Sequence, residues 1–91
     1  MKKYKELVHK YAAKIAAVKA AKAAADKALQ TFNKDKSSEE LYLQWEKAHD
    51  QYLILDAHLS HLVEQEYDSV PFDEPREKGI EQFWKSAGID H

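Results

Sequence analysis

The stretch that decides the fold is residues 41–67, which read LYLQWEKAHDQYLILDAHLSHLVEQEY. Apolar and aromatic side chains recur along it at alternating steps of four and three residues: Leu41, Trp45, Ala48, Tyr52, Leu55, Leu59 and Leu62. This seven-residue repeat places them on one stripe of a long α-helix. We therefore predict a helix over residues 38–67, with its stripe covered by other parts of the chain.

The N-terminal segment predicts a second long helix, over residues 3–32. Its stripe follows the same alternating steps, interrupted by one lysine: Tyr4, Val8, Tyr11, Ile15, Val18, Lys22, Ala25, Leu29 and Phe32. A further face consists of alanines: Ala13, Ala17, Ala20, Ala24 and Ala28. Such small side chains either allow the close approach of a partner helix or simply favour an exposed helix by propensity.

The polar residues 33–38, NKDKSS, separate the two stripes. Ser37 and Glu40 have the spacing of a capping box, which marks the start of the second helix. A short connection between two long amphipathic helices of matched length predicts an antiparallel hairpin.

Pro71 ends the second helix, and a shorter third helix is predicted over residues 75–86. Asp73 is its expected N-cap, Pro75 is tolerated in the first turn, and Gly88 is its stop signal. Its apolar face is formed by Ile80, Phe83 and Trp84, and we expect Phe72 and Trp84 to help seal the open end of the hairpin.

The predicted fold is all-α: one domain over residues 1–91, with a long, coiled-coil-like antiparallel hairpin and a short C-terminal helix packed against it. Two long helices and one short helix leave part of the apolar surface uncovered. That surface predicts either a homodimer or another protein partner.

The composition excludes several classes of protein. The chain has no cysteine, which excludes disulfides and thiolate chemistry. No apolar run approaches the roughly 20 residues of a membrane-spanning helix, and the basic N-terminus lacks the apolar core of a signal peptide. We therefore expect a cytoplasmic protein that does not associate with a membrane.

Charge is distributed unevenly along the chain. Residues 1–36 contain ten lysines and three acids, a balance of +7, and residues 37–91 contain thirteen acids and four basic residues, a balance of −9. Such asymmetry indicates either that the two halves attract one another within the fold or that the basic half binds nucleic acid.

The titratable residues do not form an evident catalytic or metal-binding set. His58, His61 and Glu64 could hold a divalent cation, but they are poorly aligned on one helix, so no metal and no cofactor are predicted. General acid–base catalysis needs a pocket that shifts a pKa, and a hairpin with one short helix offers little concavity. We therefore expect a protein that is not an enzyme.

Acidic and aromatic residues crowd the turn after the second long helix. Such a surface suits a partner with a basic surface, because charges steer the encounter and aromatic side chains anchor it. The alternative is a solvated acidic turn whose aromatic side chains face the core. The predicted partner-binding residues are Glu64, Glu66, Tyr67, Asp68, Phe72, Asp73, Glu74 and Glu77. The predicted function is a non-catalytic protein-binding module that regulates or inhibits a larger assembly, as small phage or mobile-element proteins do. The alternative is a nucleic-acid-associated protein that binds phosphates through the lysine-rich first helix.

Two short stretches resemble known families. Residues 73–80, DEPREKGI, followed by Trp84, Lys85 and Gly88, resemble the C-terminal end of nuclease-bacteriocin immunity proteins, which are small acidic four-helix inhibitors. Residues 37–41, SSEEL, with Trp45 and Ala48, are similar to one helix of the Hha-type small nucleoid modulators. Neither resemblance extends along the chain, so no functional residues are carried over and we assign no family.

Overall fold

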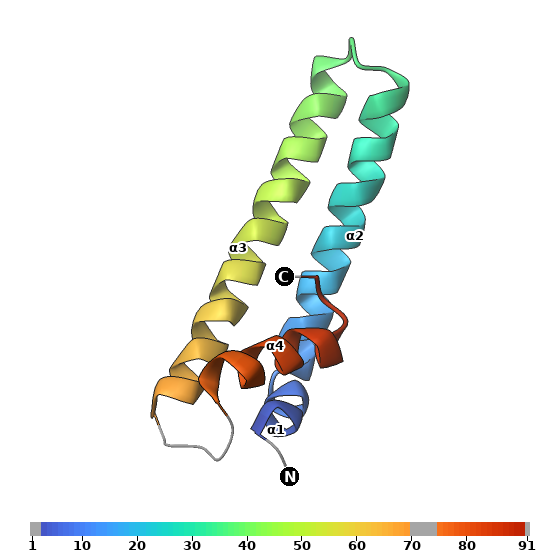
Figure 1. Ribbon diagram of the computed structural model, residues 1–91. Coiled ribbons are helices and arrows are strands. Elements are labelled where there is room, and N and C mark those ends of the chain that lie inside the picture. Colours follow the sequence, from blue (N-terminus) through green and yellow to red (C-terminus); the bar gives the residue numbers. More distant parts are fainter. Residues whose placement is uncertain (1–2, 70–74, 91) are drawn as a thin grey trace.

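The computed structural model describes residues 3–69 and 75–90, and four helices lie within these ranges (Figure 1). They are α1 (Lys3–Lys10), α2 (Ala12–Lys34), α3 (Glu39–Ser69) and α4 (Arg76–Ala87). α2 and α3 pack side by side as an antiparallel hairpin, and α4 crosses its open end in contact with α1 and α3. The molecule is elongated, with principal dimensions of 53 × 20 × 18 Å. The predicted all-α hairpin with a short C-terminal helix is confirmed.

The structure divides the predicted helix over residues 3–32 at Tyr11, whose φ of −104° and ψ of 22° depart from helical values. Backbone hydrogen bonds of 2.9 Å still cross this position, from Tyr11 N–H to the Leu7 carbonyl and from Ile15 N–H to the Tyr11 carbonyl. No proline or glycine occurs nearby to bend the helix. We attribute the bend to the packing of α1 against α4, which buries Leu7 to 1% exposure.

The turn between α2 and α3 differs from the predicted capping box by one residue. The hydroxyl of Ser38 accepts a hydrogen bond from Leu41 N–H at 3.3 Å, so Ser38 caps α3. The hydroxyl of Ser37 instead donates to Asp35 Oδ1 at 2.7 Å. The capping box on Ser37 was therefore a wrong prediction, because that hydroxyl stabilises the turn and α3 begins at Glu39.

α4 begins after Pro75, and Gly88 ends it as predicted. Gly88 has a φ of 75°, in the left-handed region. Its N–H donates to the Lys85 carbonyl, and Ile89 N–H donates to the Trp84 carbonyl, both at 3.1 Å. This pair of bonds is the Schellman arrangement, in which the residue after the glycine turns back onto the helix. Ile89 is consequently buried, at 6% exposure. The predicted N-cap, Asp73, lies outside the described residues.

The core lies at the open end of the hairpin, where α4 covers it. It comprises Leu7, Ile15, Val18, Leu59, Val63, Tyr67, Phe83, Trp84, Ala87 and Ile89. Beyond Leu59, the buried side chains of α3 leave the predicted stripe and continue at Val63 and Tyr67, which turn toward the flank of α3 that α4 occupies. Trp84 is 5% exposed, which agrees with its expected role in sealing this end.

The half of the hairpin nearest its turn has only two helices, and its stripes are half-buried. Leu29, for example, keeps 38% of its surface exposed. A row of rings stabilises this half, with centroid distances of 5.6, 5.8, 5.1 and 6.4 Å between successive members: Phe32, Tyr42, Trp45, His49 and Tyr52.

The alanine face of α2 is exposed from Ala13 to Ala24. Among the helices described, none is both long and apolar enough to cross a bilayer.

Candidate functional site

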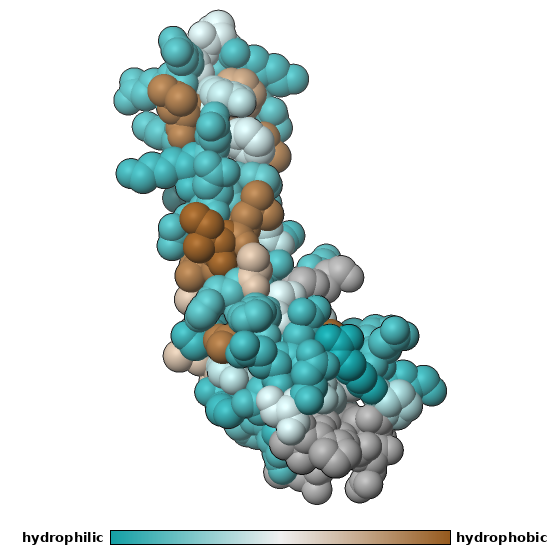
Figure 2. All heavy atoms as spheres, turned by 90° about the vertical axis from the view of Figure 1, so that its left-hand side faces the viewer, coloured by the Kyte–Doolittle hydropathy of each residue, from teal (hydrophilic) through white to brown (hydrophobic). Residues whose placement is uncertain are grey.

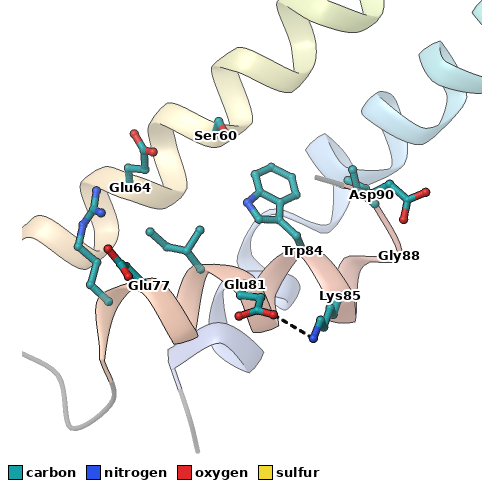
Figure 3. Close-up of a pocket in the computed structure, with 11 residues that line it drawn as sticks. Ser60, Glu64, Glu77, Glu81, Trp84, Lys85, Gly88 and Asp90 are labelled. Carbon is teal, nitrogen blue, oxygen red and sulfur yellow. Dashed lines mark ion pairs between the residues drawn. The ribbon is translucent and has the colours of Figure 1, made fainter.

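A groove of about 760 Å³ lies between α3, α4 and the residues that follow α4 (Figure 3). α3 contributes Ser60 and Glu64, and the other lining residues are Arg76, Glu77, Ile80, Glu81, Trp84, Lys85, Gly88, Ile89 and Asp90. The Schellman turn at Gly88 shapes one end of the groove, because it directs the chain back toward the hairpin. The groove is partly open to solvent.

The floor of the groove is apolar. Ile80 and Trp84 come from successive turns of α4, and Ile89 follows the Schellman turn. In Figure 3 the indole of Trp84 points from α4 into the space between α3 and the segment that carries Asp90. Trp84 and Ile89 are also core residues, at 5% and 6% exposure, whereas Ile80 is half-buried.

The rim of the groove is negatively charged. Four exposed carboxylates, Glu64, Glu77, Glu81 and Asp90, line it together with two cations, Arg76 and Lys85.

Both cations are paired with carboxylates of the chain. Lys85 Nζ lies 3.0 Å from Glu81 Oε1. Arg76 Nε donates to Asp68 Oδ1 at 2.8 Å, and this hydrogen bond raises the pKa of Arg76. Within the described residues, Glu64, Glu77 and Asp90 form no ion pair, but the negative charges of Glu64 and Glu77 add to the effect of Asp68 in raising the pKa of Arg76. The rim therefore presents carboxylates to whatever enters the groove.

Among the residues predicted to bind a partner, Glu66 instead joins α3 to α1. Its Oε1 accepts hydrogen bonds from Lys10 Nζ at 2.6 Å and from the Tyr11 hydroxyl at 3.3 Å, and its Oε2 lies 3.2 Å from Lys3 Nζ. The hydrogen bond from Lys10 lowers the pKa of Glu66, and the same bond raises the pKa of Lys10. Glu66 thus holds α1 in place at both ends.

The other predicted residues fall into three groups. Tyr67 is a core residue with 6% exposure, and Asp68 is paired with Arg76. Glu64 and Glu77 are exposed and lie together on the groove. Outside the described residues are Phe72, Asp73 and Glu74.

Of the residues that line the groove, sequence reasoning assigned only Glu64 and Glu77 to a binding surface. It missed the others: Ser60, Arg76, Ile80, Glu81, Trp84, Lys85, Gly88, Ile89 and Asp90. The spacing of residues on α4 contained part of the information needed to identify the groove. On α4 the lining residues recur at steps of four, as Ile80 and Trp84 on one row and Glu77, Glu81 and Lys85 on the next. The sequence pattern does not reveal which flank of α3 this face of α4 meets.

Part of the charge asymmetry along the sequence is used within the fold. Lys3 and Lys10 of the basic segment pair with Glu66 of the acidic segment.

His58 and His61 are exposed on α3. Across residues 3–69 and 75–90, no three histidine or carboxylate side chains are arranged to hold a metal ion.

Comparisons of the chain with protein-family models, curated proteins and solved structures found no match.

Proposed function

We propose that the chain is a non-catalytic, cytoplasmic protein-binding module that regulates or inhibits a larger protein or nucleoprotein assembly through the groove between α3 and α4. One observation carries this proposal: an apolar floor containing Ile80 and Trp84 lies beneath a rim of exposed carboxylates. A floor of this kind accepts apolar anchors, whereas the rim selects partners with basic side chains.

The partner that fits this groove is an amphipathic segment with apolar residues on one side and lysine or arginine on the flanks. Its apolar side chains would displace water from the floor, and its cations would approach Glu64, Glu77 and Asp90. Charges on an exposed rim mainly increase the association rate and decide between partners, and the buried floor supplies affinity.

Phosphate binding through the lysines of α1 and α2 is less well supported. Lys3 and Lys10 are engaged with Glu66, and Lys22 Nζ lies 4.0 Å from Asp26 Oδ2. The exposed lysines Lys14 and Lys27 lie on different sides of α2, whereas nucleic-acid binding needs a concentrated basic stripe.

The test is affinity capture from lysate of the source cells, split into nuclease-treated and untreated halves, with three tagged proteins: wild type, Glu64→Lys and Glu40→Lys. Glu40 and Glu64 are both exposed carboxylates of α3, and only Glu64 lines the groove. Glu40 is therefore the control outside the groove.

We expect wild type and Glu40→Lys to capture the same protein in stoichiometric amount at moderate salt from both halves of the lysate, and Glu64→Lys to lose most of it. Recovery of nucleic acid alone, or of proteins that disappear after nuclease treatment, would overturn the proposal in favour of phosphate binding. Equal capture by all three proteins would show that the groove is not the binding site.

A further inference from the structure

A second, separate surface lies on the side of α3 that faces away from α2. Leu43, Lys47, Asp50 and Ile54 recur there at steps of four, three and four residues, so they form one stripe on the outside of the hairpin. Leu43 is 56% exposed and Ile54 is 62% exposed, the highest values among the large hydrophobic residues described as exposed. Figure 2, which looks onto the α3 side of the hairpin, shows apolar atoms at several heights with hydrophilic atoms between them.

The four residues line a shallow depression together with Glu46 and Gln51. Lys47 and Asp50 are exposed, and neither forms an ion pair within the described residues. The stripe therefore combines two exposed apolar side chains with two charges of opposite sign that have no partner in their own chain.

The stripe is complementary to a second copy of the same stripe that runs in the opposite direction. The midpoint of the stripe falls between Ala48 and His49, and reversal about that point exchanges Leu43 with Ile54 and Lys47 with Asp50. An apolar residue thus replaces an apolar residue, and a cation replaces an anion. Steps of four, three and four are also the spacing of core positions in a coiled coil, where antiparallel helices pair such positions in mixed layers.

We propose that this stripe binds the same stripe of a second copy, with the two α3 helices antiparallel and related by a two-fold axis. Leu43 packs against Ile54 of the second copy, and Lys47 pairs with Asp50 of the second copy, with each contact made twice. This proposal goes beyond the protein-binding groove and does not rest on it, because none of the residues of the stripe lines the groove.

A parallel arrangement is disfavoured by the same residues. It would set Lys47 opposite Lys47 and Asp50 opposite Asp50 of the second copy, so that two layers of like charge would oppose association. The antiparallel arrangement also places the two α4 ends at opposite ends of the dimer. The contact is confined to one helix face, so it is smaller than a standard interface, and we expect a dissociation constant in the micromolar range.

The first test measures the mass of the protein in solution by sedimentation equilibrium over a range of concentrations. The proteins are wild type, Lys47→Asp, Asp50→Lys and the double variant Lys47→Asp/Asp50→Lys, with Lys27→Asp on the exposed surface of α2 as the control. Circular dichroism confirms that each variant is folded, which is expected because every substituted residue is exposed.

Wild type, the control and the double variant should dimerise with similar affinity, and each single charge reversal should weaken the dimer by about tenfold or more. Recovery of dimer affinity in the double variant is expected only for the antiparallel arrangement, in which residue 47 pairs with residue 50 of the second copy. A monomer mass for wild type at every concentration would overturn the proposal, and so would a failure of the double variant to recover.

The second test fixes the orientation with cysteine substitutions, which is straightforward because the chain has no cysteine of its own. In the antiparallel dimer, position 43 meets position 54 of the second copy, whereas the two copies of position 43 are about 16 Å apart along the axis. Oxidation of a mixture of Leu43→Cys and Ile54→Cys proteins should yield mainly the cross-linked pair of unlike chains. Efficient cross-linking of Leu43→Cys with itself would indicate a parallel dimer and overturn the proposal.

Discussion

The ring of Tyr67 lies directly against the backbone of Gly79. A Cβ atom at Gly79 would stand 2.5 Å from both the Cε1 atom and the hydroxyl oxygen of Tyr67. α4 can therefore approach α3 closely only because residue 79 has no side chain. Tyr67 is itself 6% exposed, so its ring has little room to move aside.

We predict that Gly79→Ala destabilises the protein by up to about 2 kcal/mol. Alanine gains about 1 kcal/mol in helix propensity over glycine, but overpacking against a buried ring costs more, typically about 1–3 kcal/mol. Urea denaturation of Gly79→Ala measures the effect. Lys78→Ala, at the exposed neighbouring position of α4, is the control and should leave the midpoint nearly unchanged. A stabilised Gly79→Ala protein would show that the contact with Tyr67 does not limit the approach of α4.

The contacts of Glu66 predict a pH dependence of stability on the acid side. The pKa of Glu66 is lowered in the folded protein by its hydrogen bond with Lys10. The folded state therefore binds this proton more weakly than the unfolded state does. The resulting stabilisation is fully present above the ordinary carboxyl pKa of 4.5 and is lost as the pH falls through the lower pKa of the folded state.

Glu66→Gln should accordingly lower the free energy of unfolding at pH 7 by about 1 kcal/mol or less, because solvent screens these partly exposed pairs. At pH 3 the difference from wild type should shrink. Urea denaturation at both pH values measures it, with Glu64→Gln, whose carboxylate has no ion-pair partner within the described residues, as the control. A difference that persists unchanged at low pH would rule out the ionised carboxylate as its cause.

Two leucines of the N-terminal half should respond differently to truncation. Leu7 is 1% exposed in the core, whereas Leu29 is 38% exposed in the two-helix part of the hairpin. Leu7→Ala should cost about 2–5 kcal/mol, the range for a buried leucine, and Leu29→Ala about 1 kcal/mol or less. Thermal denaturation monitored by circular dichroism compares them. Equal losses would mean that the core extends to the turn of the hairpin.

Trp84 provides an optical probe of the proposed binding groove. The chain has two tryptophans, so Trp45→Phe leaves Trp84 as the only one. Titration with an amphipathic peptide of leucine and lysine should change the fluorescence of Trp84, and Glu64→Lys should weaken this binding by roughly tenfold. A peptide of leucine and glutamate in the same pattern is the control. Equal responses to both peptides would contradict selection by the carboxylate rim.

The sequence was sufficient to predict the hairpin, because the spacing of the apolar residues and the matched length of the two segments determine how long amphipathic helices pack. Residues such as Leu55 and Leu59 fell on the expected stripe, and Gly88 ended α4 through a local backbone requirement. Leu7 could not be predicted as a core residue. It lies off the predicted stripe, and only the approach of α4 decides that it is buried.

The candidate site was predicted only in part for a related reason. Composition drew attention to the acidic residues after the second helix, and Glu64 and Glu77 do lie on the groove. Glu66 belongs to the same acidic cluster in the sequence, yet it faces α1 and pairs with Lys3 and Lys10. One or two positions along a helix change the direction of a side chain by about 100° or more, so proximity in sequence does not place residues on one surface.

The core combines Leu7 and Ile15 from the start of the sequence with Phe83 and Ile89 from its end. During synthesis on the ribosome, the early residues emerge long before α4 exists. Until α4 has been translated, the apolar side chains of the N-terminal helices have no complete set of partners, and the nascent hairpin exposes them. This part of the chain should therefore reach its native state only after α4 has emerged, and nascent chains that stop before α4 should be substrates for chaperones and proteases.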